Sequence, residues 1–138
     1  IVPPRFDDIA LLGRVKELLS PAGFGSISVT TAEKHDQMIA FTSQMAHVVS
    51  NAFVKSPTAR EHKGYSAGSY KDMTRVAWLN ETMWAELFLW NKDNLISEMD
   101  MFSDALASMR QKLVDDDREG LEEMFRLSTE RRKALDKK

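Results

Sequence analysis

Apolar residues are spaced differently in the first 30 residues and in the rest of the chain. Between residues 8 and 19 they recur every three or four positions, which predicts an amphipathic helix. Residues 26–30 alternate between polar and apolar types, as strands do, and Ile1-Val2, ended by two prolines, is a second candidate strand. Residues 1–30 are therefore interpreted either as strand, helix and strand or as an irregular arm packed on helices.

The strand–helix–strand interpretation has a consequence for domain organisation. Such a unit is the repeating element of a parallel sheet. A single unit leaves its strand edges unpaired and its faces uncovered, so it is not stable alone. We therefore expect residues 1–30 to be the tail of a larger α/β domain whose front part is missing from this sequence.

The rest of the chain has the periodicity of helices. Thr30-Thr31-Ala32-Glu33 matches a capping box and predicts a helix that runs to about Val54. Residues 55–67 form a polar connection, and a short helix is expected at about 69–78. The expected fold class is mainly α, with an all-helical domain at residues 31–138.

A long helix is expected from Glu81 to about Val114, with Asn80 as its N-cap, and a last helix begins near three consecutive aspartates at 115–117. Within the long helix, apolar residues alternate by four and three positions as in a heptad repeat. This seam consists of Leu95, Met99, Phe102, Leu106, Met109 and Leu113. A helix of this length in a small domain needs a neighbour along it, so we expect a homodimer through the long C-terminal helices.

Composition narrows the function classes. A net charge of −2 indicates no nucleic acid or anionic membrane as a partner. The absence of cysteine excludes disulfides and thiolate chemistry. No apolar run approaches the roughly 20 residues of a membrane span, and the N-terminus does not resemble a signal peptide. We expect a cytoplasmic protein whose numbering starts at an internal point.

Common catalytic motifs are missing from the sequence. There is no glycine-rich phosphate loop, so we expect no cofactor to be bound by this chain alone, and the three histidines lack metal-ligand spacing. The run Gly64–Gly68 matches G-x-S-x-G of α/β-hydrolases. That motif requires a preceding strand and a later histidine, whereas every histidine precedes Ser66. We therefore disfavour hydrolase activity and metal binding.

Two groups of residues are candidates for binding. His47 shares a stripe of small and polar residues on the first long helix, which can line a polar cavity or simply face solvent. Asp72 and Arg75, three positions apart, can form an ordinary surface ion pair. Alternatively, Asp72 holds the Arg75 guanidinium ready to bind a substrate carboxylate through two hydrogen bonds. Trp84 can wall a pocket or pack at the start of its helix.

Several segments together resemble the helical domain of prephenate dehydrogenases, in matching order and spacing over about residues 28–100. They are Glu33–Asp36, Ser43–His47 (the family's S-H-L-P-H segment), Gly68–Ala77 (F-x-D-x-T-R-I-A), Met83-Trp84 and Asn91-Lys92 (M-W…N-[KR]). The chain departs from the family pattern at Gln44 and Ala46, and at Asn80-Glu81, where Asp-Pro is usual.

The resemblance implies an intertwined helical dimerisation domain, like the C-terminal domain of 6-phosphogluconate dehydrogenase, behind an N-terminal Rossmann domain. It implies oxidative decarboxylation of prephenate, or of arogenate, in tyrosine biosynthesis, with NAD or NADP bound by the missing N-terminal domain. On this basis Arg75 binds a carboxylate of the dicarboxylate substrate and Asp72 orients it. His47 contacts the substrate and Trp84 borders the pocket. The fragment itself contains no catalytic residue and would be inactive.

Two other functions stay open. The chain could be a free-standing helical homodimeric interaction module without catalytic activity, in which Arg75 is only a surface residue. It could also be the helical domain of another two-domain dehydrogenase that acts on a different acid. Ligand binding and quaternary structure distinguish the three possibilities.

Overall fold

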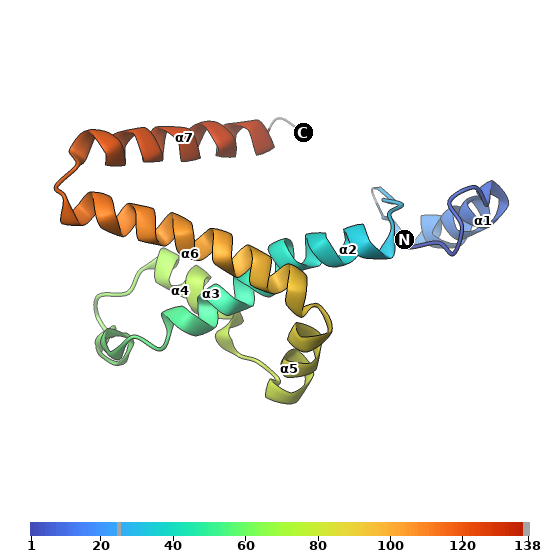
Figure 1. The fold of residues 1–138 in the computed structure, drawn as a ribbon. Coiled ribbons are helices and arrows are strands. Elements are labelled where there is room, and N and C mark those ends of the chain that lie inside the picture. Colours follow the sequence, from blue (N-terminus) through green and yellow to red (C-terminus); the bar gives the residue numbers. More distant parts are fainter. Residues whose placement is uncertain (25, 137–138) are drawn as a thin grey trace. The chain divides into compact units, whose positions relative to one another are not determined.

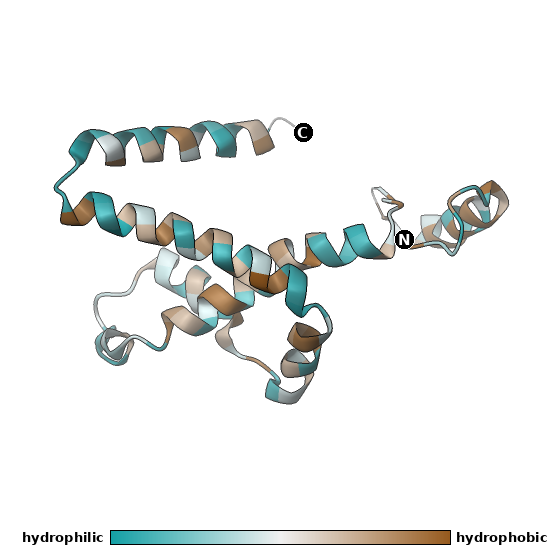
Figure 2. Ribbon diagram, in the orientation of Figure 1, coloured by the Kyte–Doolittle hydropathy of each residue, from teal (hydrophilic) through white to brown (hydrophobic). Residues whose placement is uncertain are grey.

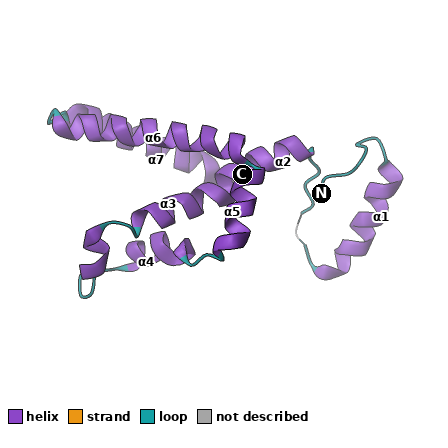
Figure 3. Cartoon of the chain, turned by 60° about the horizontal axis from the view of Figure 1, so that its bottom comes forward, coloured by secondary structure: helices purple, strands orange, loops and turns teal. Residues whose placement is uncertain are grey.

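The protein is described here from a computed structural model, which covers residues 1–24 and 26–136. These residues form helices joined by loops, and none of them is in a regular strand (Figures 1 and 3). The expected mainly α class is therefore confirmed. The chain divides into two compact units, Ile1–Ile96 and Ser97–Lys138.

The N-terminal helix α1 (Ile9–Leu19) lies where the apolar spacing predicted it. The Asp8 carboxylate accepts a hydrogen bond of 2.9 Å from the backbone N–H of Leu11, which satisfies one of the free donors at the helix start. A 3₁₀ turn follows, and Gly23 ends it with a φ of 76°, a conformation that favours glycine.

The two strands expected around α1 are reduced to a single pairing. The Ile1 ammonium donates to the Ser28 carbonyl at 2.7 Å, and the Thr30 N–H donates to the Ile1 carbonyl at 3.0 Å. These two bonds have the pattern of parallel strands in which residue 1 pairs with residue 29. Among the described residues, a regular strand over 26–30 is not formed.

The helix predicted from the residues after Thr31 to about Val54 has the expected extent but an irregular middle. It consists of α2 (Ala32–Ile39), a π segment (Ala40–Gln44) and α3 (Met45–Phe53). In the π segment the Met45 N–H bonds to the Ala40 carbonyl, five residues back. The extra residue rotates α3 by about 100° relative to an unbroken α-helix, so it determines which residues of α3 face the other helices.

The start of α2 differs in detail from the predicted capping box. Thr31 is the N-cap, and its hydroxyl accepts a hydrogen bond of 3.1 Å from the Lys34 N–H. Glu33 is therefore one residue too early to complete the reciprocal bond of a capping box. As an acidic residue in the first turn, it still interacts favourably with the helix dipole.

After α3 the chain returns through short helical turns. A 3₁₀ turn (Pro57–Glu61) interrupts the polar connection, followed by α4 (Gly68–Thr74) and a second 3₁₀ turn, η4 (Arg75–Ala77). Both α4 and η4 pack against α3. The expected short helix at about 69–78 is therefore confirmed, and its last turn tightens at Arg75.

The prediction of one long helix from Glu81 to about Val114 is wrong at one point. It is two helices, α5 (Glu81–Trp90) and α6 (Lys92–Val114), separated at Asn91, where φ is −115° and ψ is 25°. The side chain of Asn91 donates hydrogen bonds to groups on the first long helix, and this polar attachment accompanies the break. Periodicity alone does not reveal such a distant partner.

The second unit contains most of α6 and the helix α7 (Arg118–Asp136), joined by a tight turn. Asp117 caps α7 by accepting a 2.8 Å hydrogen bond from the Gly120 N–H, and Lys112 of α6 pairs with the same carboxylate at 3.0 Å. These two contacts, the backbone N–H first, lower the pKa of Asp117. Asp116 lies in this turn and has a φ of 52°.

Few apolar side chains are buried. Among residues 1–24 and 26–136 the buried apolar residues are Pro3, Ala40, Met45 and Leu95, all in the first unit. In the second unit hydrophobic and hydrophilic residues alternate along both helices, and Leu106 is 50% exposed (Figure 2). A chain of this length normally encloses a sizeable apolar core, whereas many apolar side chains of the described residues stay exposed.

Candidate functional site

His47 and Trp84, which the sequence placed 37 positions apart, are in direct contact. Their ring centroids are 3.7 Å apart and the ring planes are inclined by 31°. The imidazole belongs to α3 and the indole to α5, and both side chains are partly buried. The contact brings together two of the four residues that the sequence analysis singled out.

The hydrogen bonding of His47 fixes which ring nitrogen carries a proton. Its Nδ1 lies 3.0 Å from the Ser43 carbonyl, which can only accept, so Nδ1 is protonated. In the neutral ring Nε2 is then an acceptor, and in the charged ring it is a donor. Nε2 is thus the nitrogen with which His47 can bind a hydroxyl or an anion.

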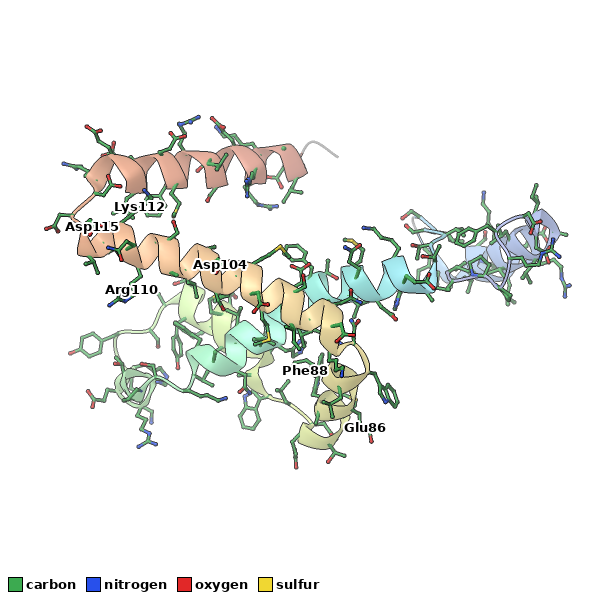
Figure 4. The ribbon with its side chains drawn as sticks, in the orientation of Figure 1. Glu86, Phe88, Asp104, Arg110, Lys112 and Asp115 are labelled. Atoms are coloured by element: carbon green, nitrogen blue, oxygen red, sulfur yellow. The ribbon has the colours of Figure 1, made fainter. Side chains whose placement is uncertain are left out.

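Trp84 is held by the local structure of α5. Asn80 is the N-cap, as predicted, and its side-chain oxygen accepts a hydrogen bond of 3.0 Å from the Met83 N–H. One turn after Trp84, Phe88 packs edge-on against the indole with a centroid distance of 5.6 Å (Figure 4). The indole therefore lies between an imidazole from α3 and a phenyl ring from its own helix.

Arg75 and Asp72 lie on the segment that packs on the other part of α3. Arg75 begins η4 and Asp72 is in α4, and both are exposed. Within the described residues, the two side chains do not form an ion pair with each other, which had been one of the sequence interpretations. Since η4 contacts α3, the guanidinium and His47 are carried by adjoining elements.

A polar cluster links the π segment to the junction of α5 and α6. Gln44 is only 4% exposed; its amide donates to the Leu87 carbonyl at 3.0 Å, and its oxygen accepts from the Asn91 amide at 3.0 Å. The Asn91 amide also donates to the Asp36 carbonyl at 2.8 Å, and Asn94 donates to the Asn91 oxygen at 2.8 Å. Both polar atoms of Gln44 are thus paired, as burial requires.

Comparison with known proteins identifies the fold and the family. Residues 31–127 match the family described as prephenate dehydrogenase, dimerization domain. The chain belongs to this family. The match covers α2 to the middle of α7 and includes His47, Arg75 and Trp84.

Individual relatives agree with the family match. A cyclohexadienyl dehydrogenase from Zymomonas mobilis is 33% identical over 117 residues, which span 80% of this chain and 40% of the relative. A prephenate dehydrogenase from Bacillus subtilis is 24% identical over 98% of this chain and 38% of its own length. The chain thus spans about two fifths of the length of these curated dehydrogenases.

Solved structures show the same fold. An arogenate dehydrogenase from Synechocystis superposes with a TM-score of 0.81 at 18% identity, over 97% of this chain and 50% of that one. A prephenate dehydrogenase from Aquifex aeolicus, solved with hydroxyphenyl propionate and NAD+, has a TM-score of 0.76 at 25% identity, over 96% and 48%. The superposed part of this chain includes the N-terminal residues as well as the helical domain.

The sequence analysis did not predict the polar cluster around Gln44 and Asn91, although both residues lie in segments that resemble the family pattern. Gln44 was noted only as a departure from the S-H-L-P-H segment, and Asn91 only as part of the N-[KR] pattern. A signal was present, because Gln44 is a polar residue next to the apolar positions Met45 and Phe41. One further buried polar group, the Ser50 hydroxyl on α3, has no hydrogen-bond partner and is 1% exposed.

Two kinds of feature, metal-ligand groups and membrane-spanning helices, are absent from the described residues. Across residues 1–24 and 26–136 no group of three or more potential ligands could hold a metal ion. No helix among the same residues is long and apolar enough to cross a membrane.

Proposed function

We propose that this chain is the dimerising, substrate-binding part of an enzyme that oxidises prephenate or arogenate with NAD or NADP and releases CO₂. The observation that carries the proposal is the His47–Trp84 contact on α3 and α5, with Arg75 on a turn that packs on the same α3. These residues lie inside the region that matches the prephenate dehydrogenase dimerization domain. The Aquifex aeolicus structure binds hydroxyphenyl propionate, an aromatic acid related in shape to such substrates.

The chemical contribution of this part is orientation of the substrate. The Arg75 guanidinium binds a carboxylate through two parallel hydrogen bonds, and its exposure leaves both donors accessible. Nε2 of His47 contacts a second polar group, and Trp84 supplies an aromatic wall. Asp72, three residues earlier in α4, is near enough in sequence to orient Arg75 when substrate is bound. Holding the ring in one pose converts an encounter into an intramolecular step.

We propose that the dinucleotide binds outside the helical domain. In α1, the Asp8 carboxylate accepts a hydrogen bond from the Leu11 N–H, one of the free donors at the start of that helix. An anionic side chain at that position competes with a pyrophosphate. The nicotinamide supplies hydride acceptance when it is bound, and we assign its binding to a Rossmann domain that precedes residue 30. Residues 1–30 then complete that domain.

We also propose that the complete protein is a homodimer through α6 and α7. The support is the exposed apolar seam of α6, including Met99, Phe102 and Leu106, together with Phe125 on α7, which is 53% exposed. Apolar surface of this extent on a soluble protein marks an interface. The family's description as a dimerization domain points to a second copy as the covering partner.

The test is Arg75→Ala in the complete protein, with Arg60→Ala, another exposed arginine of the first unit, as the matched control. Loss of a charge-assisted hydrogen-bond pair is worth about 1.5–3 kcal/mol, so KM for prephenate or arogenate should rise about 10- to 150-fold. Arg60→Ala should leave KM unchanged. Wild-type KM and kcat in Arg75→Ala would reject the site and favour a non-catalytic interaction module.

A further inference from the structure

The π segment places a carbonyl and a carboxamide at the back of the proposed site. Its Ser43 carbonyl accepts from Nδ1 of His47 at 3.0 Å, and so fixes the tautomer of the imidazole. Its last residue, Gln44, points away from solvent and bonds to α5, the helix that carries Trp84. One short segment is therefore hydrogen-bonded to the His47 ring and to α5, the helix that carries Trp84.

The bond from Gln44 to α5 serves a group that the helix cannot satisfy itself. Leu87 is among the last four residues of α5 (Glu81–Trp90), whose carbonyls lack intrahelical N–H partners. The Gln44 amide fills this role for the Leu87 carbonyl at 3.0 Å. The separation along the chain is 43 residues, so this bond fixes α5 relative to the first long helix.

Asn91 holds Gln44 in this orientation. Its amide donates to the Gln44 oxygen at 3.0 Å, which leaves the Gln44 amide nitrogen facing Leu87. The same Asn91 amide donates to the Asp36 carbonyl on α2 at 2.8 Å. Removal of this residue would leave the Gln44 oxygen without this donor, so that only the Leu87 carbonyl would still select the orientation of the carboxamide.

We infer that Gln44 and Asn91 are positioning residues that set the stacking of His47 on Trp84 by fixing the π segment to the junction of α5 and α6. The inference rests on the proposed function for its effect on substrate binding. Neither residue touches substrate in this account. Their action passes through the Ser43 carbonyl to His47 and through the Leu87 carbonyl to Trp84.

The chemistry required at position 44 is one donor and one acceptor. A neutral histidine, the residue in the family's S-H-L-P-H segment, also offers one of each. An ionised glutamate has the shape of glutamine but no donor for the Leu87 carbonyl. A leucine has neither, and it leaves the Asn91 amide with one partner fewer. The series Gln44→His, Gln44→Glu and Gln44→Leu therefore separates hydrogen bonding from volume.

The experiment uses the complete protein and two readouts. Steady-state KM and kcat are measured with prephenate, and the imidazole protons of His47 are followed by NMR, since stacking on an indole shifts them upfield. We expect Gln44→Leu and Gln44→Glu to raise KM at least about tenfold, with a smaller change in kcat, and to reduce the upfield shift. Gln44→His should recover most of both. The control Gln111→Leu, on exposed α6 surface, should change neither.

A second variant keeps the inference testable if Gln44→Leu does not fold. Asn91→Ala keeps the Gln44–Leu87 bond possible, while it removes the donor to the Gln44 oxygen and the Asp36 carbonyl and the acceptor for the Asn94 amide. Because the bond to α5 is kept, the variant should show the same two changes at smaller size. Wild-type His47 resonances in both Gln44→Glu and Asn91→Ala would overturn the inference. So would a rise in KM without any change in those resonances.

Failure of this inference is distinguishable from failure of the proposed function. If Arg75→Ala and His47→Ala raise KM but Gln44→Leu does not, the site stands and the positioning role is rejected. If the His47 resonances move in Gln44→Leu while Arg75→Ala leaves KM unchanged, the positioning of the ring pair is supported and the substrate site is rejected.

Discussion

The two units of the chain use amphipathic helices in different ways. In the first unit, Gln44 and Asn91 join separate helices by buried hydrogen bonds, and Leu95 is 4% exposed. In the second unit, α7 carries surface ion pairs within the helix, such as Arg118 with Glu122, and several of its apolar residues, including Phe125 and Leu127, stay exposed. The first unit is thus joined internally, whereas many apolar side chains of the second unit are uncovered in the single chain and would be covered in the proposed dimer.

The seam of α6 shows this difference within one helix. Leu95 and Leu106 belong to the same four-three repeat, yet the first is buried inside its own unit and the second is half exposed. The repeat therefore serves two purposes, with its first position in the core of the first unit and the later positions free to meet a partner. Surface ion pairs contribute little to stability, which leaves the apolar seam as the main source of stability for α6 and α7.

The largest expected effect is on the seam. Leu106→Asp in the complete protein buries a charge in the proposed interface, which is costly without a partner, and should weaken the dimer at least about 100-fold. Sedimentation velocity over a concentration series measures this. Ser108→Asp, two residues later and off the repeat, should leave the dimer intact. A Leu106→Asp protein as dimeric as wild type would show that a different surface covers α6.

The next effect concerns the core of the first unit. Leu95→Ala removes a buried side chain and should lower the free energy of unfolding by about 2–5 kcal/mol. Chemical denaturation followed by circular dichroism measures this. Leu113→Ala, at the exposed end of the same repeat, is the matched control, because Leu113 is 60% exposed in the single chain. At protein concentrations where the dimer dissociates, Leu113→Ala should cost much less than Leu95→Ala. Equal costs would remove the distinction between the two units.

Sequence patterns predicted the features that depend on neighbouring residues. The helix at 9–19, the Asn80 cap and the end of the first long helix near Val54 each follow from residues within a few positions. The break at Asn91 could not be predicted in this way, because its partners Asp36 and Gln44 lie 55 and 47 positions away. A helix break caused by distant hydrogen bonds leaves no local signal.

In the candidate site, too, local sequence patterns predicted single residues but not the contacts between distant ones. Spacing nominated His47 and Trp84 separately, and only the family resemblance placed them in one site; the structure then brought their rings to 3.7 Å. The π segment could not be predicted from the spacing of apolar residues, because one additional residue in a helical turn leaves a pattern that is still typical of a helix. The roles of Arg75 and Asp72 stay predictions, to be decided by the Arg75→Ala measurement.

A smaller effect is expected at the cap of α5. Asn80→Ala removes the acceptor for the Met83 N–H at 3.0 Å and should destabilise the first unit by about 1 kcal/mol. Asn80→Asp keeps an acceptor and adds favourable charge at the helix start, so it should be neutral or stabilising. Thermal unfolding of the two variants compares them. A loss as large in Asn80→Asp as in Asn80→Ala would mean that the amide group, and not the cap, matters.

The smallest effect belongs to the α6–α7 turn and depends on pH. The pKa of Asp117 is lowered from its ordinary value of 3.8 in the folded chain, by the Gly120 N–H and then by Lys112. A carboxylate with a lowered folded pKa stabilises fully above its ordinary pKa, and this contribution is lost as pH falls through the lowered folded value. Stability of the turn should therefore decline below about pH 4. The variant Asp117→Asn keeps an acceptor for Gly120 but carries no charge for Lys112, so its helix content should fall less steeply in acid. Far-ultraviolet circular dichroism between pH 6 and 2 measures the difference between the two proteins, and parallel curves would show that other carboxylates govern the acid response.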